Sequence, residues 1–232
     1  MEKKYHFWRS TKLSSMKRVI IICEGETERE FCKKVLAPHL INYNIYIQAP
    51  LIKRSMGGIV KWSVLKKEIE IHLKEQNVIV STLIDYYGLY QKFNFPNWIE
   101  GTKIIDKNLR LDFLESAMKV DVDISINHRF IPYLQLHEFE GLLFNDIQVF
   151  FDQVPKDELI GIPELKETFA NYNNPELINN SKDTAPSQRL KRIIKGYNKT
   201  LYGHYFAEAI GIDNIRAKSP RFNNWIEKII NF

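Results

Sequence analysis

Two continuous apolar runs rich in β-branched residues constrain the fold of this chain more than any other feature. Residues 18–23 read RVIIIC and residues 78–85 read VIVSTLID. A strand that is apolar on both faces must be covered on both faces, which is typical of a parallel sheet between two layers of helices. Both runs are therefore predicted to be central strands of such a sheet.

The segments around these runs alternate between helix and strand patterns. A helix ended by Pro38 is expected first, and Val64, Leu65, Ile69 and Leu73 give a later segment an apolar stripe. The expected elements, in chain order, are strand 18–23, helix 28–36, strand 43–52, helix 60–76, strand 78–85, helix 108–119 and strand 130–140. This order predicts an α/β fold in which helices flank a mainly parallel, Rossmann-like sheet of four strands.

The chain divides into a nearly neutral body and a basic end. Residues 17–145 are predicted to form the α/β domain, and residues 146–232 a mostly helical extension packed on it. The last 47 residues, 186–232, carry nine Lys and Arg against three Asp and Glu, whereas the whole chain carries 33 against 28. A basic segment of this kind suits a polyanionic partner, although it is equally consistent with a solvated surface.

Composition also indicates the cellular compartment in which the protein is expected. The two cysteines, Cys23 and Cys32, form no readable disulfide framework, which fits a reducing compartment. Neither an apolar stretch of membrane-spanning length nor the apolar core of an export signal is present in the sequence. We therefore expect a cytoplasmic protein without a membrane partner, whose start at Met1 or Met16 stays open.

Three of the four predicted strands end in acidic residues. Glu24 ends the first apolar run, Asp85 ends the run at 78–85, and Glu138 and Glu140 lie in the fourth strand. Ligands of open parallel sheets gather at the carboxyl ends of the strands. If residues 130–140 form one strand, alternation places Glu138 and Glu140 on the same face.

Carboxylates that converge on one sheet edge repel one another unless a cation neutralises them. Their hard oxygen ligands indicate Mg²⁺ or Mn²⁺ rather than zinc. Each acid also has a structural interpretation: Thr27-x-x-Glu30 reads as a capping box, Glu28 could serve the helix dipole, and Glu26 could face solvent. Acids at three strand ends favour a metal site over three separate turns.

Basic residues cluster in SQRLKRIIKGYNK, residues 187–199. At helical spacing Leu190, Ile193 and Ile194 would face the core and leave the cations outward. The candidates for contacts with nucleic-acid phosphates are Arg189, Arg192, Lys195 and Lys199. Two histidines, His137 and His204, could be general acids or structural histidines. Three tyrosines, Tyr86, Tyr87 and Tyr90, could stack on bases or pack in the protein.

Three stretches together resemble a known module. VIIICEGETE, VSTLIDYYG and RFIPYLQLHEFEGLLFND are similar to the TOPRIM domain, the metal-binding module of topoisomerases, bacterial primases and the overcoming-lysogenization-defect (OLD) nucleases. More narrowly, the chain from about Lys17 to its end resembles a family of bacterial TOPRIM-like proteins known as domain of unknown function 4276. The long motifs IPYLQLHEFEGLLF and SPRFNNWI make this narrower resemblance specific.

The resemblance implies roles for particular residues. The TOPRIM glutamate after the first strand corresponds to Glu24, the second acid of the E-G-x-x-E pattern to Glu28, and the first aspartate of D-x-D to Asp85. The second aspartate position holds Tyr87, so the chain departs at this position from the pattern of a two-metal site. Glu138 or Glu140 could supply the missing ligand by strand position. The resemblance also implies an AAA or SMC-like ATPase partner, since such proteins are often encoded beside one in anti-phage defence loci.

Two functions follow as expectations. The first is a Mg²⁺- or Mn²⁺-dependent endonuclease acting on DNA or tRNA, in which Glu24, Asp85 and Lys199 are catalytic and Glu24, Glu28, Asp85, Glu138 and Glu140 hold metal. The second is a catalytically inactive adaptor or sensor that uses the same edge to bind an ATPase or nucleic acid. The substrate and the oligomeric state stay open.

Overall fold

A parallel sheet forms the centre of the molecule. The computed structural model describes residues 16–53, 58–179 and 181–232, so residues 1–15, where no export signal was expected, lie outside it. The strands are β1 (Lys17–Cys23), β2 (Ile45–Gln48), β3 (Val78–Asp85), β4 (Phe130–Ile131) and β5 (Leu134–Gln135). They pair in parallel in the order β2-β1-β3-β4, and β5 pairs with the carboxyl end of β3.

Helices cover both faces of this sheet. The α-helices are α1 (Glu26–Phe31), α2 (Ala37–Ile41), α3 (Trp62–Leu73), α4 (Trp98–Thr102), α5 (Lys107–Asp121), α6 (Ile147–Gln153), α7 (Ile162–Asn171), α8 (Pro186–Ile193), α9 (Lys199–Ile210), α10 (Ile212–Lys218) and α11 (Pro220–Ile230). Short helical turns are the π-helix η1 (Cys32–Leu36) and the 3-10 helices η2 (Tyr86–Gly88), η3 (Gln91–Phe93), η4 (Asn127–Arg129), η5 (Phe139–Leu143) and η6 (Pro175–Leu177).

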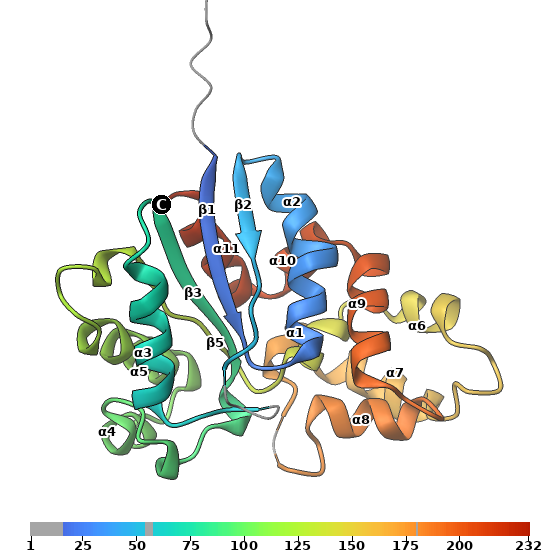
Figure 1. Cartoon of the computed structure of the whole chain (residues 1–232). Coiled ribbons are helices and arrows are strands. Elements are labelled where there is room, and N and C mark those ends of the chain that lie inside the picture. Colours follow the sequence, from blue (N-terminus) through green and yellow to red (C-terminus); the bar gives the residue numbers. More distant parts are fainter. Residues whose placement is uncertain (1–15, 54–57, 180) are drawn as a thin grey trace, which may run out of the picture.

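Alternate side chains of β1 enter two separate hydrophobic layers, as expected for a strand buried on both faces. Val19 and Ile21 pack with α1, α2 and the C-terminal helices, whereas Ile20 and Ile22 pack with α3 and α5. Figure 1 shows α3 and α5 on one side of the sheet and α1, α2 and α9 on the other. The predicted α/β fold, a parallel sheet flanked by helices, is confirmed.

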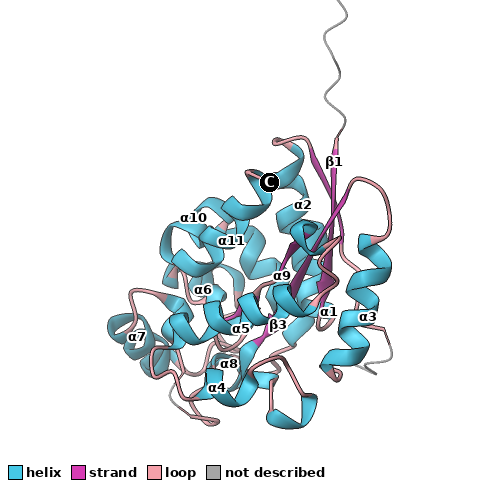
Figure 2. Ribbon diagram, turned by 90° about the vertical axis from the view of Figure 1, so that its left-hand side faces the viewer, coloured by secondary structure: helices cyan, strands magenta, loops and turns pink. Residues whose placement is uncertain are grey.

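The C-terminal helices complete the core beneath the sheet. Phe206 of α9 and Trp225 of α11 belong to the same buried layer as Val19 of β1. The Trp225 indole N–H donates to Ser81 Oγ of β3 at 2.8 Å. In Figures 1 and 2, α4 and α8 lie at the end of the molecule where β1 and β3 terminate. Among the described residues, no helix is both long and apolar enough to cross a membrane.

The expected single strand at 130–140 is wrong, because Pro132 has no N–H to continue the ladder. β4 ends before this proline and β5 begins after it. Side chains of β3 bridge the break: Ser81 Oγ donates to the Ile131 carbonyl at 2.6 Å, and Thr82 Oγ1 donates to the Tyr133 carbonyl at 2.9 Å. The need to pair these two carbonyls explains why the polar residues Ser81 and Thr82 lie within the fully buried strand β3.

The chain then turns sharply beyond β5. His137 has φ +67°, a left-handed conformation that a non-glycine residue rarely adopts. Glu138 precedes η5, and Glu140 lies within it. The prediction that strand alternation aligns Glu138 with Glu140 is therefore wrong, since neither residue belongs to a strand.

The first helix also differs from the prediction of a helix ended by Pro38. Helix α1 begins at Glu26, and the π-helix η1 connects it to α2 without an intervening loop. Pro38 lies in the first turn of α2, where a missing N–H costs little. The expected capping box is wrong as well: Gly25 is the N-cap, no side chain caps α1, and Glu30 instead pairs with Lys33 at 3.2 Å.

Candidate active site

Four acidic side chains lie together where β1 and β3 end. Glu24 follows β1, Glu28 is on α1, Asp85 is the last residue of β3, and Glu140 is in η5. Glu28, Asp85 and Glu140 are buried, and Glu24 is half-buried. The structure therefore brings together four of the five acids that the sequence predicted as a cluster.

Hydrogen bonds between carboxylates and backbone fix these strand ends to one another. Glu24 Oε2 accepts from the backbone N–H of Asp85 at 3.0 Å. Asp85 Oδ1 in turn accepts from the backbone N–H of Phe139 at 2.8 Å. The chain segments after β1, β3 and β5 are thereby connected through two acidic side chains.

Lys199, the first residue of α9, is the cation that pairs with this cluster. Its Nζ lies 2.9 Å from Glu140 Oε1 and 3.8 Å from Glu28 Oε1. Lys199 can reach these acids because α9 packs closely on α1. The closeness is seen at Gly203, where a Cβ would lie only 2.5 Å from Thr27 Cγ2. A glycine at that position lets the two helices approach.

The crowding of these acids changes their ionisation. Burial, followed by the charge of Glu28, raises the pKa of Glu24 to about 7. Burial also raises the pKa of Glu140 to about 7 against the opposing effect of Lys199, and burial raises the pKa of Asp85 well above its ordinary value. Burial lowers the pKa of Lys199, but Glu140, Asp85 and Glu28 outweigh it, so the ammonium stays charged. Perturbed groups of this kind are typical of functional sites.

We expect the metal-free protein to lose stability as the pH rises from 6.5 to 8. Glu24 and Glu140 hold protons in the folded state up to about pH 7, above their ordinary value of 4.5, so the folded state binds more protons than the unfolded state in this window. The two groups together lower the unfolding free energy by on the order of 1–2 kcal/mol over this window, which is a few degrees in Tm. Thermal unfolding in EDTA at the two pH values measures this loss.

Glu140→Gln is the control for that titration and should remove about half of the decrease in stability between pH 6.5 and 8. His39 and His137, whose pKa values are lowered chiefly by burial, partly offset this loss, because their imidazoles in the unfolded state still release protons just above pH 6.5. A Tm that rises between pH 6.5 and 8 in EDTA would contradict the assignment of raised pKa values to the cluster.

The cluster suits a hard divalent cation in the kind of atoms it offers. Both carboxylate oxygens of Glu140 are buried; Oε1 lies 2.9 Å from the Lys199 ammonium, whereas Oε2 makes no hydrogen bond to any described residue. Across residues 16–53, 58–179 and 181–232, no three His, Cys, Asp or Glu side chains converge closely enough to hold a metal ion. Carboxylate oxygens are ligands that suit Mg²⁺ or Mn²⁺, but in this arrangement the Lys199 ammonium lies among them.

Glu138, the fifth predicted acid, has a different environment. Its Oε2 accepts from the backbone N–H of Ser187 at 2.8 Å and its Oε1 accepts from the Ser187 hydroxyl at 3.0 Å. The carboxylate thus caps the N-terminus of α8. Ser187 was missed from the sequence, because its partner lies 49 residues away and no local pattern connects the two.

The predicted basic residues do not form one free surface. Leu190, Ile193 and Ile194 are buried as predicted, yet two of the expected outward cations are engaged. Arg192 donates to both oxygens of Glu164, and Arg189 donates to the Thr184 carbonyl and Thr168 Oγ1.

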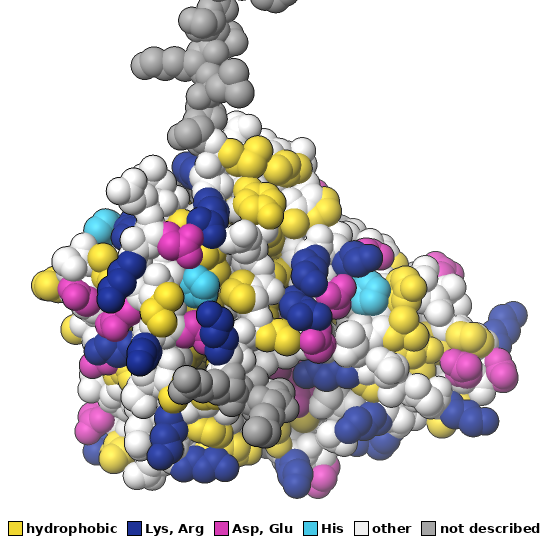
Figure 3. Space-filling view, viewed as in Figure 1, with side chains coloured by type: hydrophobic (Ala, Val, Ile, Leu, Met, Phe, Trp, Pro, Cys, Tyr) yellow, Lys and Arg dark blue, Asp and Glu magenta, His cyan; other side chains and the backbone are white. Residues whose placement is uncertain are grey.

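Lys195 is exposed. Figure 3 shows Lys and Arg side chains spread over one face and interleaved with acids. Nucleic-acid contacts by Arg189, Arg192, Lys195 and Lys199 stay a prediction.

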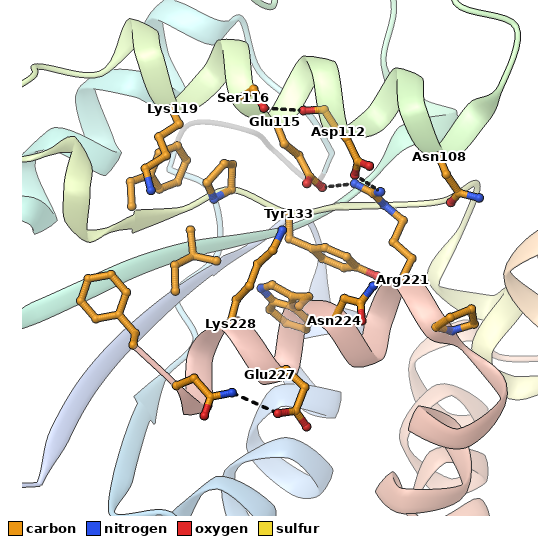
Figure 4. A pocket seen from close by; sticks show the side chains of 17 residues that line it. Asn108, Asp112, Glu115, Ser116, Lys119, Tyr133, Arg221, Asn224, Glu227 and Lys228 are labelled. Carbon is orange, nitrogen blue, oxygen red and sulfur yellow. Dashed lines mark hydrogen bonds and ion pairs between the residues drawn. The ribbon is translucent and has the colours of Figure 1, made fainter.

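A cavity of about 960 Å³ lies away from the acid cluster, between α5 and α11. Figure 4 shows Arg221 of α11 reaching across it to Asp112 and Glu115 of α5. Tyr133 and Trp225 stack in its wall with ring centroids 4.5 Å apart. Because its guanidinium and carboxylates neutralise one another, this cavity lacks the uncompensated charge of the acid cluster.

Comparison with known proteins gives a family and a distant structural likeness. The chain matches no curated protein. Two solved structures of the C-terminal region of the Xanthomonas campestris pv. campestris OLD protein are similar to it. The one phased with mercury has a TM-score of 0.41 and 14% identity, and the one phased with iodine has a TM-score of 0.40 and 16% identity. Each alignment covers 93% of this chain and 96% of the other.

A family model matches nearly the whole chain. The model is described as "Domain of unknown function (DUF4276)", and it matches residues 23–230. This range includes the acid cluster, Lys199 and both long motifs that carried the resemblance. The chain belongs to the DUF4276 family.

Proposed function

We propose that this protein is a metal-dependent phosphodiesterase that cleaves nucleic acid. The observation that carries the proposal is the cluster of Glu24, Glu28, Asp85 and Glu140 around Lys199 at the carboxyl edge of a parallel sheet. Crowding three buried acids and one half-buried acid around a single ammonium costs free energy. A divalent cation would offset that cost.

The chain's own residues have distinct parts in this function. Glu24, Glu28, Asp85 and Glu140 would hold Mg²⁺ or Mn²⁺, with Glu138 less free to do so because Ser187 occupies both of its oxygens. When bound, such an ion polarises a phosphodiester and lowers the pKa of an attacking water. The Lys199 ammonium lies beside the carboxylates and would neutralise negative charge on the phosphate oxygens.

A cleavage assay tests the proposal. Purified protein is incubated with plasmid, single-stranded DNA and tRNA in Mg²⁺, in Mn²⁺ and in EDTA. We expect cleavage of at least one substrate with either ion and background rates in EDTA, since the carboxylates then lack a cation that activates water. Equal cleavage in EDTA would contradict a metal-dependent mechanism.

A second function is an inactive adaptor or sensor that binds an ATPase or nucleic acid at the same edge. Two observations favour it: Tyr87 stands where a second aspartate would be expected, and the described acids do not converge as a preformed metal site. Calorimetry separates the two functions. Micromolar Mn²⁺ binding together with cleavage supports the nuclease, whereas nucleic-acid binding without Mn²⁺ binding supports the adaptor.

We also propose a defence role for the nuclease, as the effector that works with an AAA or SMC-like ATPase against phage. The support is the resemblance of the long motifs to a family often encoded beside such ATPases. Co-purification with the ATPase of the same locus tests this role.

A further inference from the structure

A second, smaller pocket adjoins the acid cluster. It has a volume of about 250 Å³ and lies where η2, the start of α5 and the segment after η6 meet. The residues that matter in its lining are Tyr86, Tyr87, Lys107, His137, Asn179 and Lys182. Two covalent connections tie it to the cluster, since Tyr87 is two residues after Asp85 and His137 is three residues before Glu140.

The residues that line the pocket carry a net positive charge, although the nearby acids Glu138 and Asp183 act electrostatically on its Tyr87. Among the described residues that line it there are two lysines and no acid. Lys107 Nζ lies 3.2 Å from His137 Nε2 and 3.4 Å from the Asn179 carbonyl, and neither partner is negatively charged. Lys182 makes no ion pair with any described residue. The neighbouring Asp106 is engaged elsewhere, because its carboxylate caps α5 by accepting from Leu109 N–H.

The histidine in this pocket is held in a strained backbone conformation. His137 adopts φ +67°, and its carbonyl accepts from Tyr87 N–H at 2.9 Å. Its Nε2 accepts a hydrogen bond from the Lys107 ammonium at 3.2 Å. Backbone strain that positions a side chain in a pocket is typical of functional sites.

We propose that this pocket binds a backbone phosphate of the nucleic-acid substrate, next to the phosphate held at the acid cluster. This inference rests on the proposed function and adds to it a second point of contact with the substrate. Lys107 and Lys182 supply the charge that a phosphate requires. A volume of about 250 Å³ is large enough to admit a phosphate group.

Calorimetry of the metal-free protein at low ionic strength tests the inference, with inorganic phosphate and a short oligothymidylate as probes. Lys107→Met should weaken the binding of both probes about tenfold, because a charge-assisted hydrogen bond is lost. The salt dependence of oligonucleotide binding should also fall by about one in the log–log slope.

Lys119→Met is the matched control. Lys119 is on the same helix, makes no ion pair with any described residue, and lines the larger cavity of Figure 4. This variant should bind both probes like the unchanged protein. The inference is overturned if the unchanged protein binds no phosphate, if Lys107→Met binds it equally well, or if Lys119→Met loses it. It is also overturned if Lys107→Met weakens phosphate but not oligonucleotide binding.

These outcomes are distinct from failure of the proposed function. Phosphate binding is measured in EDTA and needs no cleavage. A protein that binds phosphate through Lys107 but cleaves nothing in Mn²⁺ would keep the pocket and lose the nuclease, and the reverse result would keep the nuclease and lose the pocket.

Discussion

Asp85→Asn is expected to reduce metal-dependent cleavage at least about 100-fold without unfolding the protein. Asp85 is buried at the end of β3, and its Oδ1 accepts from Phe139 N–H at 2.8 Å. An asparagine retains an oxygen in the same position, so this backbone contact can persist. What the substitution removes is the negative charge that a divalent cation requires.

The stability of this variant separates a functional role from a structural one. Burial raises the pKa of Asp85, which means that the ionised carboxylate is unfavourable in the folded state. Asp85→Asn should therefore be at least as stable as the unchanged protein at pH 8 in EDTA. A group that weakens the fold and supports activity is typical of an active site.

Cleavage rates and thermal unfolding check both expectations together. Asp157→Asn is the control, because Asp157 is exposed in the segment after α6 and its side chain makes no hydrogen bond or ion pair with any described residue. It should leave rate and Tm unchanged. A folded Asp85→Asn protein that cleaves at the unchanged rate would remove Asp85 from the site.

The part of this site that follows from strand patterns was predictable. Continuous β-branched runs identified β1 and β3, and parallel strands place their carboxyl ends at one edge. That reasoning brought Glu24 and Asp85 together without any knowledge of side-chain contacts. It succeeded because the backbone of a parallel sheet determines the position of both residues.

The contribution of the HEFE segment was not predictable in the same way. Alternation requires an unbroken strand, and Pro132 with the left-handed His137 breaks it twice. Glu140 nevertheless reaches the cluster, from a 3-10 helix rather than a strand. Its neighbour Glu138 caps α8 instead. Contacts between segments that are distant in the sequence decided the outcome for both residues.

The ion pairs of Arg192 and Lys199 could not be predicted from the sequence either. Helical spacing predicted which face of α8 is buried, but it could not show that Glu164 of α7 binds Arg192. Nor could it show that Gly203 brings α9 close enough to α1 for Lys199 to reach Glu28 and Glu140. Such ion pairs depend on how helices pack, which local patterns do not specify.

Lys199→Met should destabilise the metal-free protein by on the order of 2 kcal/mol at pH 8, or roughly 6 °C in Tm. The variant leaves the buried acids without the ammonium that lies 2.9 Å from Glu140, while methionine retains the apolar stem. Removal of one partner from a fully buried ion pair costs about 3–5 kcal/mol. The smaller figure applies here because the Lys199 side chain is 46% exposed.

The pH dependence of this loss identifies its cause. Glu24 and Glu140 take up protons in the folded state near pH 7, so at pH 5.5 they need no cation. The destabilisation by Lys199→Met should consequently be smaller at pH 5.5 than at pH 8. Lys195→Met is the control at both values, because Lys195 is exposed and forms no ion pair with any described residue.

Divalent metal should restore the variant more than the unchanged protein. In the unchanged protein Mn²⁺ must enter a cluster that Lys199 already neutralises in part, whereas in Lys199→Met it meets the same carboxylates with no competing charge. The rise in Tm on adding saturating Mn²⁺ at pH 8 is therefore expected to be larger for Lys199→Met, a comparison that needs no activity. Equal rises in the two proteins would show that the ammonium and the metal do not share these carboxylates, and the acids around Lys199 would then be a structural ion-pair network.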